Sequence, residues 1–329
     1  MQKVRWGVLS TAKIAKEWLI PAMQESEYAE VVAVASRDLS RAQAYAKETG
    51  IPKAYGSYEE LLQSDEVDAI YNPMPNHMHV SWSIEAVKAG KHLLCEKPLG
   101  LDAADAQKLV DVAAQSPKLV VMEAFMYRFH PQWLKIRELI ESGAIGKVRQ
   151  VQTSFTYFNR DATNVRNKPG IGGGGLLDIG CYCISAARFA FGTEPQQVVG
   201  TLKIDEDFQV DHHANGILDF GDGVATFNCS TQSNSSQMVN IIGEEGRIFV
   251  DTPFYKREDK PCELVVYKEH DKEIIPIGHF NHYVSEIDAF SQAVQAGESA
   301  PTPLADAMAN MRVIDGIFSS HETGGWVKL

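Results

Sequence analysis

The sequence predicts an α/β domain with a doubly wound parallel sheet, followed by an α+β domain with a large, open and predominantly antiparallel sheet. The length of 329 residues exceeds the size at which one core usually keeps growing, which favours two domains. From residue 4 to about 125, short apolar runs alternate with helix-like segments. After about residue 145, polar and apolar residues alternate as in strands. We place the domains at 1–124 and 125–329.

The elements of the first domain follow from its apolar runs and helix signals. The expected strands are 4–9, 31–35, 69–72, 92–95 and 119–123. Ser57-Tyr58-Glu59-Glu60 is typical of a capping box, and Asp102 precedes an alanine-rich helix. Gly50 and Gly90 stand where helices are expected to end.

The second domain is predicted to be rich in strands. These are expected at 148–158, 197–204, 212–219, 223–230, 237–242, 247–251, 263–268 and 273–277. The turn Phe220-Gly-Asp-Gly223 favours antiparallel pairing. Helices are expected at 176–191, at 282–296 and from Pro303 onward, and the last of them is expected to pack back on the first domain.

Composition excludes several classes of function. A net charge of −12 disfavours a nucleic-acid partner, because such partners are bound by clustered Lys and Arg. Without an apolar run of about 20 residues or a signal-like start, we expect a cytoplasmic protein with no membrane partner. The five cysteines lack CxxC spacing, and neighbouring residues of Asp211-His212-His213 would point to opposite faces of a strand. We therefore expect no metal site.

A candidate phosphate-binding loop follows the first strand. Ser10-Thr-Ala-Lys-Ile-Ala15 has the spacing of the dinucleotide fingerprint G-x-G-x-x-G/A, with Ser and Ala at the glycine positions. A strand-to-helix turn offers backbone N–H groups and a positive helix end to a pyrophosphate. The alternative is a plain turn that binds nothing. The loop residues expected at the cofactor are Ser10, Thr11, Ala12, Lys13 and Ile14.

The end of the second strand indicates the type of cofactor. An acidic residue there would bond the ribose hydroxyls of NAD, whereas the hydroxyl and guanidinium of Ser36-Arg37 suit the 2′-phosphate of NADP. We therefore expect NADP rather than NAD. The alternative is that Arg37 is a solvated charge; Asp38 can cap the next helix in either case.

Polar residues also follow the third and fourth strands. Strand four runs into Cys95-Glu96-Lys97-Pro98, at the strand end where open α/β sheets bind ligands. Pro98 restricts Lys97 to extended angles or takes a cis bond, and either would aim the lysine at the crevice. Strand three runs into Tyr71-Asn-Pro-Met-Pro-Asn-His-Met-His79, a proline-stiffened loop that could line the nicotinamide ribose.

These motifs together resemble the Gfo/Idh/MocA family of oxidoreductases over essentially the whole chain. The combination of N-P-x-P-N-x-x-H with E-K-P carries the resemblance, whereas the glycine-poor loop is not specific. The resemblance implies an N-terminal Rossmann domain and a catalytic role for Lys97. The residues that it places near the cofactor are Asn72, Pro73, Pro75, Asn76, His79 and Glu96.

The family's second signature matches Gly174-Gly-Leu-Leu-Asp178-Ile-Gly-Cys-Tyr182. Asp178 and Tyr182 lie four residues apart and so share a helix face. Many members have His where this chain has Tyr182. The tyrosine resembles the branch of glucose-fructose oxidoreductase, dimeric dihydrodiol dehydrogenases and NADP-dependent D-xylose dehydrogenases, which implies a sugar, polyol or trans-dihydrodiol substrate.

The resemblance leads to a hypothesis for catalysis. A free phenol has a pKa near 10, and a nearby ammonium lowers it. Tyr182 would then act as the acid/base, assisted by Lys97, while Asp178 would bond a substrate hydroxyl or hold the lysine. Arg166 would reach the cofactor as in some relatives, and Phe158 and Tyr283 are the candidates for the substrate pocket.

Two alternatives to an enzyme remain open from the sequence. One is a non-catalytic NADP(H)-sensing regulatory protein, which needs the phosphate loop but not both Lys97 and Tyr182. The other is an interaction scaffold built on the C-terminal sheet. Because an open antiparallel sheet needs its second face covered, we also expect a homodimer formed through that sheet.

Overall fold

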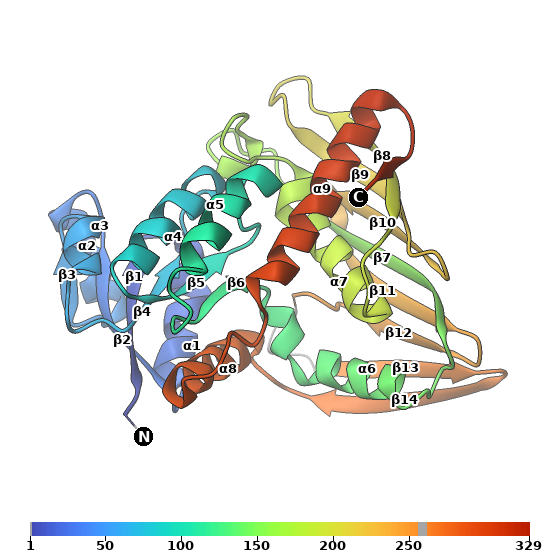
Figure 1. Cartoon of the computed structure of the whole chain (residues 1–329), viewed down its shortest axis with the longest axis horizontal. Coiled ribbons are helices and arrows are strands. Elements are labelled where there is room, and N and C mark those ends of the chain that lie inside the picture. The colour runs from blue at the N-terminus through green and yellow to red at the C-terminus, as the bar shows by residue number, and fades with distance from the viewer. Residues whose placement is uncertain (1, 256–261) are drawn as a thin grey trace. The chain divides into compact units, whose positions relative to one another are not determined.

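The computed structural model describes residues 2–255 and 262–329, which form two compact units (Figure 1). Unit 1 runs to Met126 and includes Asn281–Met308, and unit 2 comprises Tyr127–Phe280 and Ala309–Leu329. In the part of the chain that the structure describes, no helix is both long and apolar enough to cross a membrane.

Unit 1 contains the expected parallel sheet. Its strand order is β3-β2-β1-β4-β5-β6, and all its strand pairs are parallel. The strands are β1 (Val4–Leu9), β2 (Ala29–Ala35), β3 (Lys53–Tyr55), β4 (Ala69–Asn72), β5 (His92–Glu96) and β6 (Val121–Ala124). The order reverses at β1, which lies between β2 and β4. The carboxyl ends of these strands flank the crevice in which such sheets bind ligands.

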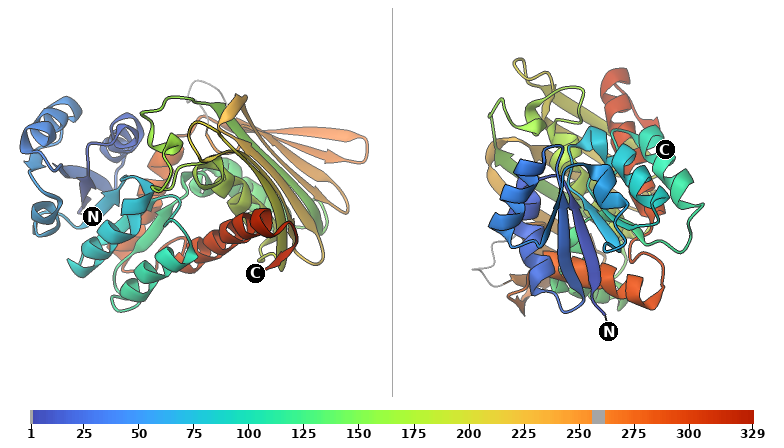
Figure 2. Two further views of the ribbon diagram at one scale, coloured as in Figure 1. Left: turned by 90° about the horizontal axis from the view of Figure 1, so that it is seen from above. Right: turned by 90° about the vertical axis from the view of Figure 1, so that its left-hand side faces the viewer.

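Helices cover both faces of this sheet, with α1 on one face and α4 and α5 on the other (Figure 2). The expected caps at Asp38, Ser57 and Asp102 are confirmed, because each side chain accepts a backbone N–H three residues later. The helical elements are η1 (Ala15–Leu19), α1 (Ile20–Glu25), α2 (Leu39–Thr49), α3 (Tyr58–Leu62), η2 (Asn76–Met78), α4 (His79–Lys88), α5 (Ala103–Ala113) and α8 (His282–Ala296).

Helix α8 belongs to unit 1, although its sequence position assigned it to the second domain. Its Ser291 Oγ accepts a hydrogen bond from the Trp6 indole at 3.3 Å, and its Asp288 carboxylate accepts one from Ser26 Oγ at 2.5 Å. Phe290 packs on Trp6, with ring centroids 4.9 Å apart. The assignment of 125–329 to one domain is therefore wrong for this segment, whose apolar side completes the core around β1. The final helix, α9 (Leu304–Thr323), groups with unit 1 only up to Met308.

Unit 2 contains the expected large sheet, with the order β14-β13-β12-β11-β7-β10-β9-β8-β15. All its pairs are antiparallel except that of β7 with β10. Phe220 N donates to Gly223 O at 2.9 Å in the expected β9–β10 turn. The strands are β7 (Val148–Phe158), β8 (Gln197–Ile204), β9 (Asp211–Asp219), β10 (Val224–Ser230), β11 (Gln232–Gly243), β12 (Arg247–Asp251), β13 (Cys262–Lys268), β14 (Asp271–Gly278) and β15 (Val327–Lys328).

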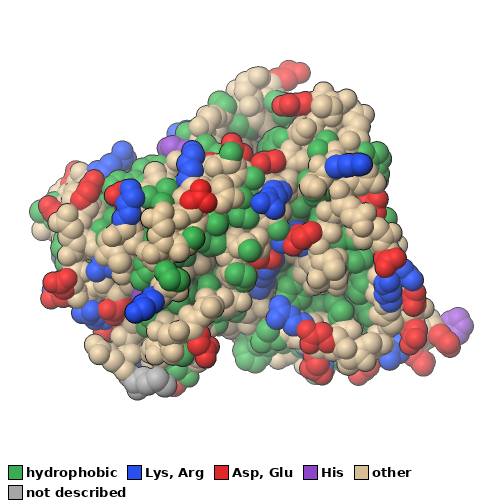
Figure 3. Space-filling model, in the orientation of Figure 1, with side chains coloured by type: hydrophobic (Ala, Val, Ile, Leu, Met, Phe, Trp, Pro, Cys, Tyr) green, Lys and Arg blue, Asp and Glu red, His purple; other side chains and the backbone are tan. Residues whose placement is uncertain are grey.

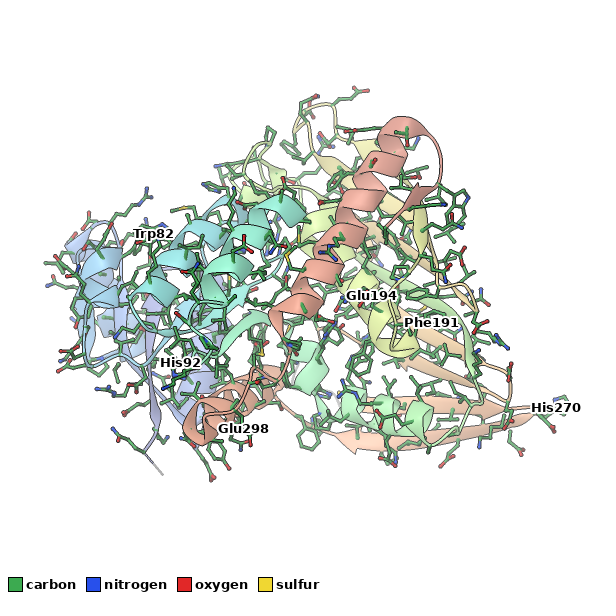
Figure 4. All side chains as sticks on the ribbon, viewed as in Figure 1. Trp82, His92, Phe191, Glu194, His270 and Glu298 are labelled. Carbon is green, nitrogen blue, oxygen red and sulfur yellow. The ribbon has the colours of Figure 1, made fainter. Side chains whose placement is uncertain are left out.

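One helical segment, formed by η5 (Leu176–Gly180) and α7 (Cys181–Phe191), packs against β7 and β10. Its far end is fixed by Arg188, whose guanidinium bonds both carboxylate oxygens of Glu194 at 2.6 and 2.7 Å. Figure 4 labels Glu194 beside Phe191, where α7 ends. Helix α6 (Pro131–Glu141) was not expected from the sequence; it begins with proline at its first position, where the missing N–H costs nothing.

Acidic and basic side chains are interspersed over the face of the molecule in Figure 3. The side chains drawn on that face therefore form no extended basic surface of the kind that nucleic-acid phosphates require. This mixture is consistent with a net charge of −12 spread over the surface.

Candidate active site

The loop after β1 has the backbone shape that the fingerprint requires. Ser10, at the first glycine position, has φ +72°, a conformation that glycine favours and other residues rarely adopt. Ala12 at the second glycine position is half-buried, and its carbonyl accepts a hydrogen bond from the Tyr45 hydroxyl at 2.9 Å. The following helical turn includes Lys13 and Ile14. Small side chains before a helix start thus fit a pyrophosphate.

At the end of β2, the side chains are arranged as the NADP prediction requires. Ser36 is buried and its Oγ accepts the Asp38 N–H at 3.4 Å, whereas Arg37 is exposed. Asp38 is engaged with α2, since it accepts bonds from Ser40 Oγ at 2.6 Å and Arg41 N at 3.1 Å. The hydroxyl of Ser40, followed by the backbone N–H of Arg41, lowers the pKa of Asp38.

The loop after β4 is held from beneath by two buried side chains. The Asn72 amide donates to His79 O and Ser83 Oγ at 3.0 and 3.1 Å. The two ring nitrogens of His79 lie 2.7 Å from Pro98 O and 2.6 Å from Met74 O. Asn72 and His79 are at most 1% exposed, so these side chains position the loop rather than form its surface.

The state of His79 follows from its burial. Burial lowers its pKa to about 4, although both backbone carbonyls favour the protonated ring. A neutral imidazole carries one N–H and donates to only one of the two carbonyls. The surface of this loop comes instead from Pro75 and Asn76, which are half-buried, while Pro73 is buried.

Lys97 follows β5 immediately, is half-buried, and is joined to Pro98 by a cis peptide bond. The carboxylate of Glu96 is fixed on the same strand end: it accepts the Tyr71 hydroxyl at 2.7 Å and the Lys97 N–H at 3.3 Å. Burial, followed by the charge of Glu96, raises the pKa of Tyr71 well above its usual value, so Tyr71 is a stable donor. The strand ends therefore place a lysine beside an anchored carboxylate.

A second buried acid, Glu286 of α8, lies close to Glu96 in unit 1. Glu286 is 1% exposed, and burial followed by the charge of Glu96 raises its pKa well above its usual value. Tyr283, expected to line a pocket, is 5% exposed and stacks on Trp18 with ring centroids 5.8 Å apart. Sequence analysis missed Glu286; its position on the apolar stripe of α8, between Tyr283 and Phe290, was the available signal.

In unit 2, the carboxylate of Asp178 is fixed by two side chains. Arg166 Nε donates to Asp178 Oδ1 at 2.7 Å, and the Tyr157 hydroxyl donates to Oδ2 at 2.5 Å. Burial, then the charge of Asp178, raises the pKa of Tyr157, which keeps the phenol protonated. Arg166, expected at the cofactor, is thus engaged with Asp178. Sequence analysis missed Tyr157, because no local pattern connects it to Asp178.

Tyr182 stands one helical turn after Asp178 on the same segment, as expected. It is 6% exposed and lies among aromatic rings, with centroids 5.9, 5.7 and 5.5 Å from those of Tyr127, Phe155 and Phe254. Phe158, the other pocket candidate, is 67% exposed at the end of β7. Asp178 and Tyr182 therefore place a carboxylate and a phenol on the same side of this helix.

Within residues 2–255 and 262–329, no group of three or more His, Cys, Asp or Glu side chains could hold a metal ion. The carboxylate of Asp211 instead accepts the backbone N–H of Leu176 at 2.7 Å.

Comparison with known proteins identifies the family. Residues 4–124 match an oxidoreductase family with an NAD-binding Rossmann fold, and residues 133–249 match the GFO/IDH/MocA C-terminal domain. The chain belongs to the Gfo/Idh/MocA family of oxidoreductases. The expected family, fold class and enzyme class are therefore confirmed, and the protein is an NAD(P)-binding oxidoreductase.

Individual relatives lie in the predicted branch of this family. D-xylose 1-dehydrogenase (NADP(+)) 2 of Haloferax volcanii is 37% identical over 98% of this chain and 99% of the relative. Trans-1,2-dihydrobenzene-1,2-diol dehydrogenase of Bos taurus is 34% identical over 83% of this chain and 80% of the relative.

A solved structure extends the likeness to the whole fold. It is that of KijD10, a 3-ketoreductase from Actinomadura kijaniata in complex with NADP and TDP-benzene, which is 30% identical. The alignment covers 97% of this chain and 98% of KijD10, with a TM-score of 0.90. KijD10 has also been solved with a lysine replaced by alanine and with a tyrosine replaced by phenylalanine.

Proposed function

We propose that this oxidoreductase uses NADP to transfer a hydride between the nicotinamide and a carbinol or carbonyl carbon of a sugar, polyol or trans-dihydrodiol. The observation that carries the proposal is the pairing on one helix of an anchored carboxylate, Asp178, with Tyr182 one turn later. Relatives that act on xylose and on a dihydrodiol support this substrate class.

The choice of NADP is supported by β2 and by the relatives. Arg37 is exposed after the buried Ser36, so its guanidinium can meet a 2′-phosphate. Asp38 caps the first turn of α2 through Oδ1, which it can do with either cofactor, so the choice depends on Ser36 and Arg37. A D-xylose dehydrogenase named for NADP(+) and a reductase solved with NADP are among the similar proteins.

We assign the acid/base role to Tyr182 and the orienting role to Lys97. In the oxidation, Tyr182 in its phenolate form takes the hydroxyl proton and becomes a phenol as the hydride leaves the substrate carbon, and Lys97 orients the reacting oxygen. The nicotinamide, when bound, supplies the hydride acceptor. Asp178, held by Arg166 and Tyr157, accepts a hydrogen bond from a neighbouring substrate hydroxyl. Asn72, His79 and Glu96 position the strand ends on which Lys97 lies.

The test is turnover of NADP with a panel of aldoses, polyols and trans-dihydrodiols, using wild-type enzyme, Tyr182→Phe and Lys97→Met. Each variant should lose more than about tenfold in kcat/KM, or about 1.4 kcal/mol of transition-state stabilisation. Exposed Lys118 of unit 1 and half-buried Tyr267 of unit 2 provide the controls. Lys118→Met and Tyr267→Phe should retain wild-type values, and retention by the two site variants would refute the assigned roles.

The same panel separates the enzyme from a non-catalytic NADP(H) sensor. A sensor would bind NADP tightly and show no turnover with any member of the panel, whereas an enzyme reduces the bound NADP. The presence of both Lys97 and Tyr182 favours the enzyme, because sensing requires neither an acid nor a base.

The quaternary state that we propose is a homodimer formed through the sheet of unit 2. Apolar side chains that include Ile204, Ile217 and Val224 are exposed on β8, β9 and β10. When the same face of a second copy covers this face, the exposed apolar side chains of both copies are buried, which favours association. Sedimentation equilibrium should therefore give twice the chain mass, and a monomer mass would contradict the proposal.

A further inference from the structure

The first residue of β9, Asp211, is joined to the start of the helical segment that carries Asp178 and Tyr182. Its Oδ2 accepts the Leu176 N–H at 2.7 Å, and the neighbouring Gly175 N–H also favours the ionised form of this carboxylate and so lowers its pKa. Asp211 is 3% exposed and lies 35 residues further along the chain than Leu176. A buried carboxylate from the sheet thus caps a helix whose own preceding residue, Gly175, has no side chain to do so.

The loop before the helix is shaped around this carboxylate. Gly174 has φ +111°, and a Cβ atom at this position would overlap Asp211 Oδ1. The Gly174 N–H donates to Arg166 O at 2.9 Å, and Gly174 O accepts the Asp178 N–H at 3.1 Å. Asp211, the loop and the two residues of the Asp178–Arg166 pair are therefore linked by direct contacts.

We propose that Asp211 is a positioning residue for the reaction. By fixing the start of the helical segment, it holds Asp178 and Tyr182 in the positions that catalysis requires. The inference rests on the proposed function of that pair. Asp211 itself is buried and accepts a backbone N–H, that of Leu176. Its effect should therefore appear in kcat, because small displacements of reacting groups reduce rates strongly.

The contact depends on the ionised carboxylate. An ionised Asp211 accepts the Leu176 N–H more strongly than a protonated carboxyl would, and the protonated form adds an O–H that needs a partner of its own. The contact at the helix start should then weaken, and Asp178 lies two residues beyond Leu176. Protonation of Asp211 should thus disturb the Asp178 pair.

Burial raises the pKa of Asp211 to about 6, and the charge of Asp178 adds to this. Other titratable groups packed around it are Cys229 on β10 and, through Asp178, Tyr157 on β7 and Arg166. His212 and His213 follow Asp211 on β9 itself. Because the ionised form is the working one, kcat should fall as the pH is lowered through about 6.

The experiment measures kcat and the KM for NADP from pH 5 to pH 9 for Asp211→Asn, Gly174→Ala and Gly170→Ala. Asp211→Asn removes the titration, so its kcat should be about tenfold lower above pH 7 and should lose the acid limb, with the KM for NADP unchanged. Gly174→Ala should lower kcat similarly. Gly170 is the matched control, because it shares a positive φ of +75° but a Cβ there meets nothing within 4 Å.

The outcomes separate this inference from the proposed function. If Tyr182→Phe retains wild-type turnover, the proposed function fails. If Tyr182→Phe is inactive while Asp211→Asn keeps the wild-type kcat and acid limb, only the role of Asp211 is refuted. Should Asp211→Asn fold poorly, Gly174→Ala decides: a kcat equal to that of Gly170→Ala overturns the inference, and a kcat about tenfold lower supports it.

Discussion

The two units arrange their candidate residues in different ways. In unit 1, Ser36-Arg37 and Glu96-Lys97 each lie at the end of a parallel strand, so the strand itself places the side chains at the sheet edge. In unit 2, Asp178 depends on Tyr157, 21 residues away, and its helix depends on Asp211 of β9. Local sequence thus places the residues of unit 1 that we assign to the cofactor, whereas tertiary contacts place the residues of unit 2 that we assign to the substrate.

The largest effect that should distinguish the two units is the loss of NADP affinity expected from Arg37→Ala in unit 1. Loss of a charged hydrogen bond to a phosphate costs about 1.5–3 kcal/mol, or about tenfold to a hundredfold in affinity. The dissociation constant for NADP should rise by this factor, while that for NAD should stay within about twofold. Fluorescence titration of the protein with each dinucleotide measures both values.

Arg37→Lys is the graded variant for this test. It keeps the charge but loses the planar fork, so the affinity for NADP should fall between those of the wild type and Arg37→Ala. An unchanged affinity for NADP in Arg37→Ala would mean that Arg37 is only a solvated charge, and cofactor selection would then not be a local property of β2.

A smaller effect, on turnover rather than on binding, is expected from Arg166→Met. The Asp178 side chain is 9% exposed and would lose its guanidinium partner, although Arg166 itself is 44% exposed and the Coulomb energy is correspondingly screened. We expect kcat to fall about tenfold with no change in the dissociation constant for NADP. Steady-state kinetics and dinucleotide titration provide these two readouts.

Arg160→Met is the matched control for that variant. Arg160 is 42% exposed and pairs with Asp207 at 2.6 Å and Asp205 at 3.1 Å in the same unit. Its loss should reduce stability to a similar extent and leave kcat unchanged. If both variants reduced kcat equally, the effect of Arg166 would be general destabilisation and not the placing of Asp178.

The fold could be predicted from the sequence where an element is long and periodic. The strand β7 and the helix at 176–191 correspond closely to the expected bounds. Two short strands, β3 and β15, were missed, because segments of three and two residues become strands only by pairing with β2 and β8. The placement of α8 in unit 1 was missed. Its apolar residues predict a helix with one buried side, but they do not indicate which of the two sheets that side packs against.

Prediction of the site was limited by the same physics. Lys97, Asp178 and Tyr182 could be proposed from the sequence because each lies in a motif of consecutive residues. Tyr157 and Asp211 act through hydrogen bonds to distant partners, which no residue pattern records. His79 and Asn72 were found, but as cofactor contacts; burial, which shows that they hold the loop, is not a property of the motif.

The smallest predicted effect concerns Glu286. This residue is far from Glu96 in the sequence but lies close to it in unit 1. Glu286 Oε1 has no hydrogen-bond partner among the described residues, so Glu286→Gln should raise the melting temperature at pH 8 and change it little at pH 5. A gain of about 1 kcal/mol corresponds to about 2–4 °C for a protein part of about 150–250 residues. Thermal unfolding at both pH values measures the difference.

The sign of this effect follows from linkage. The folded-state pKa of Glu286 lies above the unfolded value. As the pH rises, the unfolded chain therefore loses this proton before the folded protein does, and the free energy of unfolding falls. Glutamine carries no such proton, which removes the penalty at pH 8. Glu298, exposed just after α8 and labelled in Figure 4, is the control: Glu298→Gln should show the same small shift at both pH values. A shift for Glu286→Gln that is equal at pH 5 and pH 8 would show that the carboxyl is not held protonated by its burial.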